Sequence, residues 1–238
     1  MRAVIVGSAG FDGAVEAWDI DTPHGPACLH RCEGGVLLFR HGRPHRLLPN
    51  QMNFRANAWA LKHARVTALL VTSSVGVMDL NVPLFELLRV KDIAMLGNRL
   101  PDGSTCSMWP EPTEGQGYLL SNQLLHRELG DWLGLQRAVD FLYVPGPRTK
   151  TPAENRMYSS LGIPVNSMTL GPEVVLAAEL GIPVTAAVVG HKYSVPGGPE
   201  ADITASLHSS RDAMRALILR FLRDAPSPAP RDALYRFA

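Results

Sequence analysis

The stretch from Val144 to Tyr193 constrains the fold more than any other part of this 238-residue chain, because it alternates short apolar runs with helix signals. A glycine and a proline end the apolar run FLYV. Thr151, Pro152 and Glu154 then supply the capping group, the first-turn proline and the first-turn acid of a helix start. We therefore expect a helix from about Pro152 to Ser160.

The rest of this stretch repeats the alternation. The segment IPVNSM after Gly162 is short and apolar enough for a buried strand, and PEVVLAAEL from Pro172 predicts a helix that Gly181 stops. IPVTAAVVG is then a further buried strand. Such an order indicates right-handed crossover units on a largely parallel sheet, in which ligands bind beyond the carboxyl ends of strands. Those ends are Met168, Thr169, Gly190, His191 and Lys192.

Length and charge exclude several classes of protein. The chain has 46% hydrophobic residues and a formal net charge of +1, which suits one α/β domain with a sizeable core and argues against a nucleic-acid partner. No apolar run reaches about 18 residues, and no secretory leader is recognisable, so we expect no membrane association and a cytoplasmic protein. Three cysteines form no even framework, which fits a reducing compartment.

Two groups of residues have some likeness to metal ligands. Cys28, His30 and Cys32 alternate along the chain without a second cluster, which favours ordinary packed or surface residues. His41 and His45 form a histidine pair, but no third ligand lies near them in the sequence. We therefore predict no metal site.

Two strand ends in the first third of the chain carry candidate anion-binding groups. AVIV is followed by the loop Gly7–Gly10, whose backbone amides can hold an anion, although a plain tight turn has the same composition. The run GGVLLF ends in Arg40 and His41. A guanidinium beside an imidazole suits a phosphate or carboxylate dianion, because the guanidinium donates two hydrogen bonds in fixed geometry.

Further along, the buried strand VTALLV ends in hydroxyls at Thr72, Ser73 and Ser74, which is also common turn chemistry. SVPGGPEADI after Tyr193 is a glycine- and proline-rich loop with the composition of a lid. Residues 206–223 place apolar side chains at helical spacing and predict an amphipathic helix. Residues 225–238 read as a loosely attached, proline-rich tail.

Several of these motifs together resemble the trimeric purine nucleoside phosphorylase and methylthioadenosine phosphorylase family. The matching elements are GPR, the pair Ala153 and Glu154, Met168 with Thr169, PEVVLAAELG, RHG with His45, and NFRAN before a helix containing WAL. The resemblance implies a single α/β domain over residues 1–224, with a central, partly closed mixed sheet flanked by helices. It also implies a homotrimer or hexamer, with Met108, Trp109 and Pro110 reaching a neighbouring subunit's site.

The resemblance implies a phosphate site and a substrate site. The phosphate-site residues are Arg40, His41, Ser73 and Thr169, with Ser8 in place of the family's loop hydroxyl, whose position aligns with Ala9. The implied substrate-binding residues are Ser74, Gly76, Thr149, Lys150, Glu154, Met168, Lys192 and Ser194. Met168 would pack under the ribose, and Glu154 would either position the ribose hydroxyls or order the loop.

The base site departs from the family pattern. The Asn or Asp that contacts the leaving purine aligns with Lys192, the second base-contacting position with Lys150, and the stacking Phe with Thr149. Charged lysines only donate hydrogen bonds, so we expect a base rich in carbonyl or carboxylate oxygens, or one that leaves as an anion. If the alignment slips by a residue, His191 becomes the donor. The catalytic candidates are therefore Lys192, His41 and His191.

The function that follows is phosphorolysis of a purine-type or modified nucleoside to free base and pentose 1-phosphate, with base specificity altered by Lys150 and Lys192. The partners are a small-molecule nucleoside and phosphate as co-substrate, without a further cofactor. The alternatives are nucleoside hydrolysis or reverse glycosylation in a specialised pathway, or a non-catalytic nucleoside-binding homologue.

Overall fold

The computed structural model describes residues 1–8, 11, 13, 15–109, 118–197, 203–230 and 233–236. Within them, nine strands form one mixed sheet: β1 (Arg2–Val6), β2 (Glu16–Thr22), β3 (Gly25–Cys32), β4 (Gly35–Phe39), β5 (Ala68–Val77), β6 (Leu87–Met95), β8 (Ala138–Tyr143), β9 (Val165–Ser167) and β10 (Val184–Tyr193). Two short strands, β7 (Tyr118–Leu120) and β11 (Leu234–Arg236), form a separate pair. The helices are α1 (Phe54–His63), α2 (Arg127–Trp132), α3 (Pro152–Ser159), α4 (Gly171–Glu179) and α5 (Ile203–Asp224), with a 3-10 turn at Pro49–Gln51.

Part of the large sheet is closed. The strand order is β10-β6-β8-β9-β5-β1-β4-β3-β2, and β10 also pairs with β5, so the first five strands form a small barrel from which the other four extend. Strand β5 runs parallel to β1 and β10 and antiparallel to β9. This arrangement confirms the predicted fold class, a central mixed and partly closed sheet flanked by helices.

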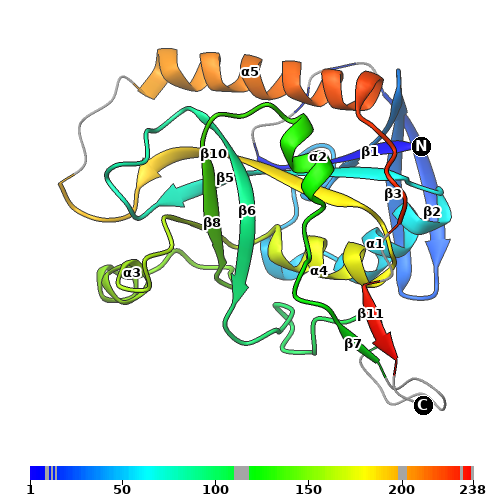
Figure 1. The fold of residues 1–238 in the computed structure, drawn as a ribbon, viewed down its shortest axis with the longest axis horizontal. Coiled ribbons are helices and arrows are strands. Elements are labelled where there is room, and N and C mark those ends of the chain that lie inside the picture. Colours follow the sequence, from blue (N-terminus) through cyan, green and yellow to red (C-terminus); the bar gives the residue numbers. More distant parts are fainter. Residues whose placement is uncertain are drawn as a thin grey trace.

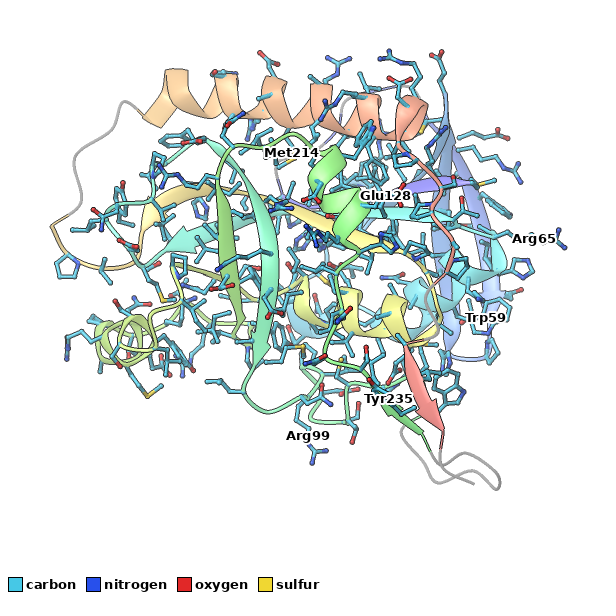
Figure 2. The ribbon with its side chains drawn as sticks, viewed as in Figure 1. Trp59, Arg65, Arg99, Glu128, Met214 and Tyr235 are labelled. Atoms are coloured by element: carbon cyan, nitrogen blue, oxygen red, sulfur yellow. The ribbon has the colours of Figure 1, made fainter. Side chains whose placement is uncertain are left out.

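Helices cover both faces of the sheet (Figure 1). Along β1, Ala3 and Ile5 pack in the cluster that contains α1 and α4, whereas Val4 and Val6 pack in the cluster that contains α5. The alternation follows from the two-residue period of a strand, and both faces are apolar because both are covered. Met214 points from α5 toward the sheet, and Arg65 and Arg99 point away from the body of the molecule (Figure 2).

Helix α4 is buried along its whole length. Its sequence GPEVVLAAE is apolar on every side except at Glu173 and Glu179, as expected of a helix packed between α1 and the barrel. Glu179 accepts a hydrogen bond of 2.6 Å from the backbone N–H of Met108. Met108 is also buried in its own chain. This corrects the expectation that it reaches a neighbouring subunit. Pro110 lies outside the described residues.

The helix after Thr151 matches its prediction closely. Helix α3 spans Pro152–Ser159, with the Thr151 hydroxyl and the Glu154 side chain forming a capping box. The strand predicted over residues 66–71 instead continues to Val77, because the hydroxyl-bearing residues after Val71 still pair with β10.

Two parts of the fold were not predicted. The hairpin of β2 and β3 extends the sheet at its edge, where Arg31 lies over the ring of Trp18 at 4.4 Å. In the tail, Ala225 is buried, its carbonyl accepts from Arg2 Nε at 2.5 Å, and Ser227 Oγ lies 3.0 Å from Thr67 Oγ1. The first residues of the tail are thus held against the domain, contrary to the loose attachment predicted for them.

Candidate functional site

A cavity of about 380 Å³ opens where β1, β4, β5, β9 and β10 present their polar residues. Twelve of the fourteen predicted site residues line it: Ser8, His41, Ser73, Ser74, Gly76, Thr149, Lys150, Met168, Thr169, His191, Lys192 and Ser194. Arg40 and Glu154 do not. The structure therefore brings together residues that are up to 186 positions apart in the sequence (Ser8 to Ser194).

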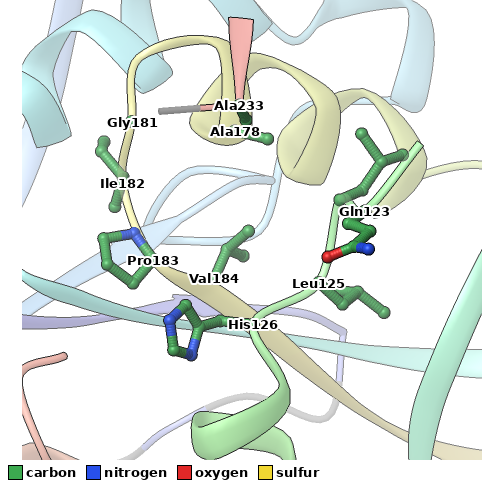
Figure 3. A pocket seen from close by; sticks show the side chains of 10 residues that line it. Gln123, Leu125, His126, Ala178, Gly181, Ile182, Pro183, Val184 and Ala233 are labelled. Carbon is green, nitrogen blue, oxygen red and sulfur yellow. The ribbon is translucent and has the colours of Figure 1, made fainter. Parts of the chain in front are cut away.

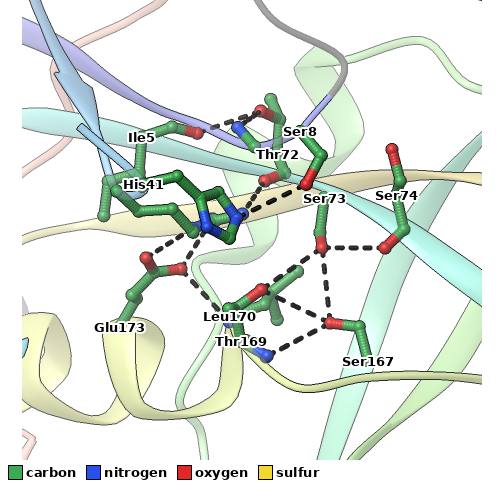
Figure 4. Close-up of polar contacts among 12 residues, drawn as sticks. Ile5, Ser8, His41, Thr72, Ser73, Ser74, Ser167, Thr169, Leu170 and Glu173 are labelled. Atoms are coloured by element: carbon green, nitrogen blue, oxygen red, sulfur yellow. Dashed lines mark hydrogen bonds and ion pairs between the residues drawn. The ribbon is translucent and has the colours of Figure 1, made fainter. Parts of the chain in front are cut away.

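Three hydroxyls of the cavity lining lie close together (Figure 4). Ser73 Oγ lies 3.3 Å from Ser167 Oγ and 3.4 Å from Thr169 Oγ1, and the latter two oxygens are 3.4 Å apart. Leu170, with φ of 69°, turns the chain from this cluster into α4. Each hydroxyl can rotate to donate a hydrogen bond, so the cluster can bind an oxyanion.

His41 lies beside Ser8, and both residues line the cavity. Its Nδ1 is 2.9 Å from the carbonyl oxygen of Leu47, which only accepts, so Nδ1 carries the proton. In the neutral ring, Nε2 is then an acceptor for the hydroxyl of Ser8 at 3.4 Å. Burial, opposed by the Leu47 carbonyl and assisted by Arg40 and His45, lowers the pKa of His41 to about 4. The neutral ring can accept a hydrogen bond from a protonated phosphate oxygen.

We expect His41 to make the protein less stable on acidification. Its folded-state pKa of about 4 lies below the ordinary 6.5, so the unfolded chain binds the extra proton first. The stability that the neutral His41 ring contributes to the folded state is fully present above about pH 6.5 and is lost as the pH falls through about 4. Urea unfolding between pH 4 and 7 should show this fall, and His41→Gln should flatten it. An unchanged slope in the variant would contradict the assignment.

Arg40 is behind the cavity wall and not in it. Its side chain is 1% exposed, and Nε and Nη2 each donate a 2.7 Å hydrogen bond to one carboxylate oxygen of Glu173. Nη1 donates to the carbonyl of Thr72 at 2.7 Å. A Cβ on Gly7 would lie 2.9 Å from Nη1, so the glycine lets the loop approach this guanidinium. The structure thus gives Arg40 a supporting position, whereas direct phosphate contact stays a prediction.

Glu154 also lies outside the cavity lining. Its two oxygens accept from Arg148 at 2.7 and 2.8 Å, and one of them accepts from the backbone N–H of Thr151 at 2.7 Å. Glu154 was predicted either to position the ribose hydroxyls or to order the loop. These contacts fit the second role, because they hold the loop before α3, and that loop contains Lys150. Contact with a ribose stays a prediction.

A β-bulge shapes the part of the cavity that β10 lines. The pairing of β10 with β5 shifts between Gly190 and Lys192. In a regular strand, neighbouring residues point to opposite faces, but a bulge re-aims one of them. Both His191 and Lys192 accordingly line the cavity, so either side chain can donate a hydrogen bond to a ligand there.

The cavity carries excess positive charge. Lys150 and Lys192 both line it, and among its described lining residues none is acidic. Burial and the charge of Lys192 lower the pKa of Lys150, against the opposing effect of Glu154. An anionic or oxygen-rich ligand would relieve this repulsion.

Sequence reasoning missed several lining residues, namely Pro49, Asn155, Asn166, Ser167 and Tyr193. The side-chain oxygens of Asn155 and Asn166 are buried and have no hydrogen-bond partner among the described residues. A signal was available for Asn166, because an amide in a segment predicted to be a buried strand is unusual unless something pairs with it.

A second, smaller cavity of about 20 Å³ lies between α4, β10 and the segment before α2, and it has room for roughly one water molecule (Figure 3). The described residues hold no group of three or more His, Cys, Asp or Glu side chains able to bind a metal. The rings of His41 and His45 stack with centroids 4.1 Å apart. Within the described ranges, every helix is too short or too polar for a membrane span.

Solved structures with the same architecture define the class of fold. A methylthioadenosine phosphorylase from Schistosoma mansoni in complex with adenine superposes with a TM-score of 0.78 at 20% identity, over 93% of this chain and 90% of that one. A methylthioadenosine phosphorylase from an antarctic soil metagenomic library gives 0.78 at 22% identity, over 98% and 92%. At these identities the likeness establishes the nucleoside phosphorylase fold.

Sequence comparison places the chain within that fold. It belongs to the phosphorylase superfamily, whose family model matches residues 2–223. It is 32% identical to the S-methyl-5'-thioadenosine phosphorylase of Caenorhabditis elegans over 77% of this chain and 70% of the relative. It is also 32% identical to a probable 6-oxopurine nucleoside phosphorylase of Moorella thermoacetica, over 76% and 75%. The predicted family and enzyme class are confirmed.

Proposed function

We propose that this protein catalyses phosphorolysis of a purine-type nucleoside, releasing the free base and a pentose 1-phosphate. The observation that carries the proposal is one cavity lined both by a hydroxyl cluster and by two lysines. An oxyanion nucleophile and an electron-rich leaving group can then lie on either side of a sugar. Methylthioadenosine and 6-oxopurine nucleoside phosphorylases among the relatives support this reaction.

The reaction follows from these positions. Phosphate rests on the hydroxyls of Ser73 and Thr169, beside Ser8 and His41, and its oxygen attacks the anomeric carbon. The electron pair of the breaking bond passes to the base nitrogen. An N–H of Lys192, or of His191, stabilises or protonates that nitrogen as charge develops. Met168 packs under the ribose, and phosphate serves as co-substrate without a metal or redox cofactor.

The same proposal includes the preferred base, the oligomeric state and the location of the protein. The lysines favour a base rich in oxygen acceptors, because a charged ammonium donates and does not accept. We further propose a homotrimer or hexamer in the cytoplasm, working on small molecules alone. The family resemblance supports the assembly, and the cysteine usage supports the compartment.

The test is a panel of inosine, adenosine, methylthioadenosine, methylthioinosine and xanthosine, each incubated with the protein with and without phosphate. Chromatography follows free base and pentose 1-phosphate. Cleavage that requires phosphate is the expected result. Cleavage without phosphate would make the protein a hydrolase, and no cleavage of any compound would indicate a non-catalytic relative or an unusual nucleoside.

A further inference from the structure

We propose that Asn166 is a specificity-determining residue and that, together with Lys150 and Lys192, it selects a base with two carbonyls flanking an N–H, the imide edge of a dioxopurine. The inference rests on the proposed function for its base subsite. It goes further by assigning a hydrogen-bond pattern to that subsite: a donor, an acceptor and a second donor.

The acceptor is the side-chain oxygen of Asn166. This residue is 1% exposed, and its Nδ2 donates to the carbonyl of Gly76 at 3.4 Å. Because that carbonyl only accepts, the bond fixes which end of the amide carries the oxygen. Oδ1 is then left buried without a partner among the described residues, although Asn166 lines the cavity. A buried unpaired acceptor is costly, and a ligand N–H in the cavity would satisfy it.

The sheet register places the first donor nearby. Asn166 on β9 is paired with Gly76 on β5, and Gly76 is paired with Lys192 on β10. The three residues therefore form one row across adjacent strands, with a glycine in the middle. A side chain on Gly76 would collide with Ser194 and approach the Asn166 amide. Glycine keeps this row open, so one planar ring can reach both the amide and the ammonium.

The second donor is Lys150. It lies in the loop after β8, which is the neighbour of β9 in the sheet, and it lines the same cavity as Asn166 and Lys192. The two ammonium groups are close enough for the charge of Lys192 to lower the pKa of Lys150. Two donors flanking an acceptor complement a carbonyl, an N–H and a second carbonyl in sequence.

The pattern discriminates among purines. Xanthine presents carbonyl, N–H and carbonyl, whereas hypoxanthine lacks the second carbonyl. Guanine replaces that carbonyl with an amine, which would face an ammonium. Adenine offers a ring nitrogen acceptor where the N–H is required. Sites built to hydrogen-bond a ligand group reject analogues that lack it, because their own polar groups are then left unpaired.

Direct binding of free bases to the full chain tests this without requiring turnover. Calorimetry should give xanthine an affinity at least about 10-fold above hypoxanthine, guanine and adenine, and about 10- to 100-fold above 1-methylxanthine, which keeps both carbonyls but lacks the N–H between them. Equal binding of xanthine and 1-methylxanthine would overturn the role of Asn166. Tightest binding of adenine would overturn the whole pattern.

Variants assign the pattern to residues. Asn166→Leu should weaken xanthine and hypoxanthine by about 10- to 100-fold and leave adenine unweakened. Asn155→Leu is the matched control, because it removes the other unpartnered amide of the lining. If that variant alone loses xanthine, the acceptor is Asn155 and the proposal is wrong. Selective xanthine binding without phosphorolysis would sink the proposed function and leave this inference standing, and phosphorolysis confined to aminopurines would do the reverse.

Discussion

Replacing Glu173 by glutamine should lower the free energy of unfolding by about 3–5 kcal/mol, because it leaves the guanidinium of Arg40 buried without a countercharge. The pair is joined by two hydrogen bonds of 2.7 Å, and both side chains are at least 97% buried. Glutamine keeps the size of the side chain and an oxygen for the N–H of Leu170, which Glu173 accepts at 3.2 Å. Urea unfolding measures the change.

Two further variants isolate the effect of burial. Arg148 and Glu154 form a similarly short bidentate ion pair at the surface. Glu154→Gln should therefore change the free energy of unfolding far less than Glu173→Gln. The double variant Arg40→Met with Glu173→Leu removes both buried charges and should be less destabilised than either charge removed alone. Equal losses in the buried and surface variants would show that burial of the pair does not matter.

Replacing Lys192 by methionine should lower kcat/KM for the preferred nucleoside by about 10²- to 10³-fold, because the leaving base loses a positioned donor where its negative charge develops. Methionine keeps most of the length of the side chain without its charge. Steady-state phosphorolysis measures the loss. Retained activity in this variant, together with loss in His191→Ala, would move the donor role to His191.

Surface charge and pH provide the controls for Lys192. Lys91→Met removes an exposed lysine of the same barrel, 3.2 Å from Asp140, and should leave kcat/KM unchanged. The positive charge of Lys192 helps to lower the pKa of Lys150, so removing it should raise that pKa. Lys150 would then keep its charge to higher pH, and the alkaline limb of the residual pH–rate profile should move upward. A downward shift would contradict the proximity of the two lysines.

The local elements were largely predictable because their signals lie within a few residues. Thr151, Pro152 and Glu154 form the cap that the sequence predicts, and the apolar runs of β4, β8 and β10 are strands. The extent of β5 was not predictable in this way. Its hydroxyl-bearing half pairs with β10 and lines the cavity, so long-range pairing overrides the polar composition that suggested a turn.

The sequence by itself determined the family, the helix caps, the covered strands and most of the side chains that line the cavity, because motifs and periodicity are local. Only the tertiary structure decided that Arg40 lies behind the cavity wall with Glu173, 133 residues away, and that Asn166 faces Gly76 across a strand pair. Barrel closure and sheet register fix these contacts. Both depend on pairing between distant segments, and no spacing along one segment encodes that pairing.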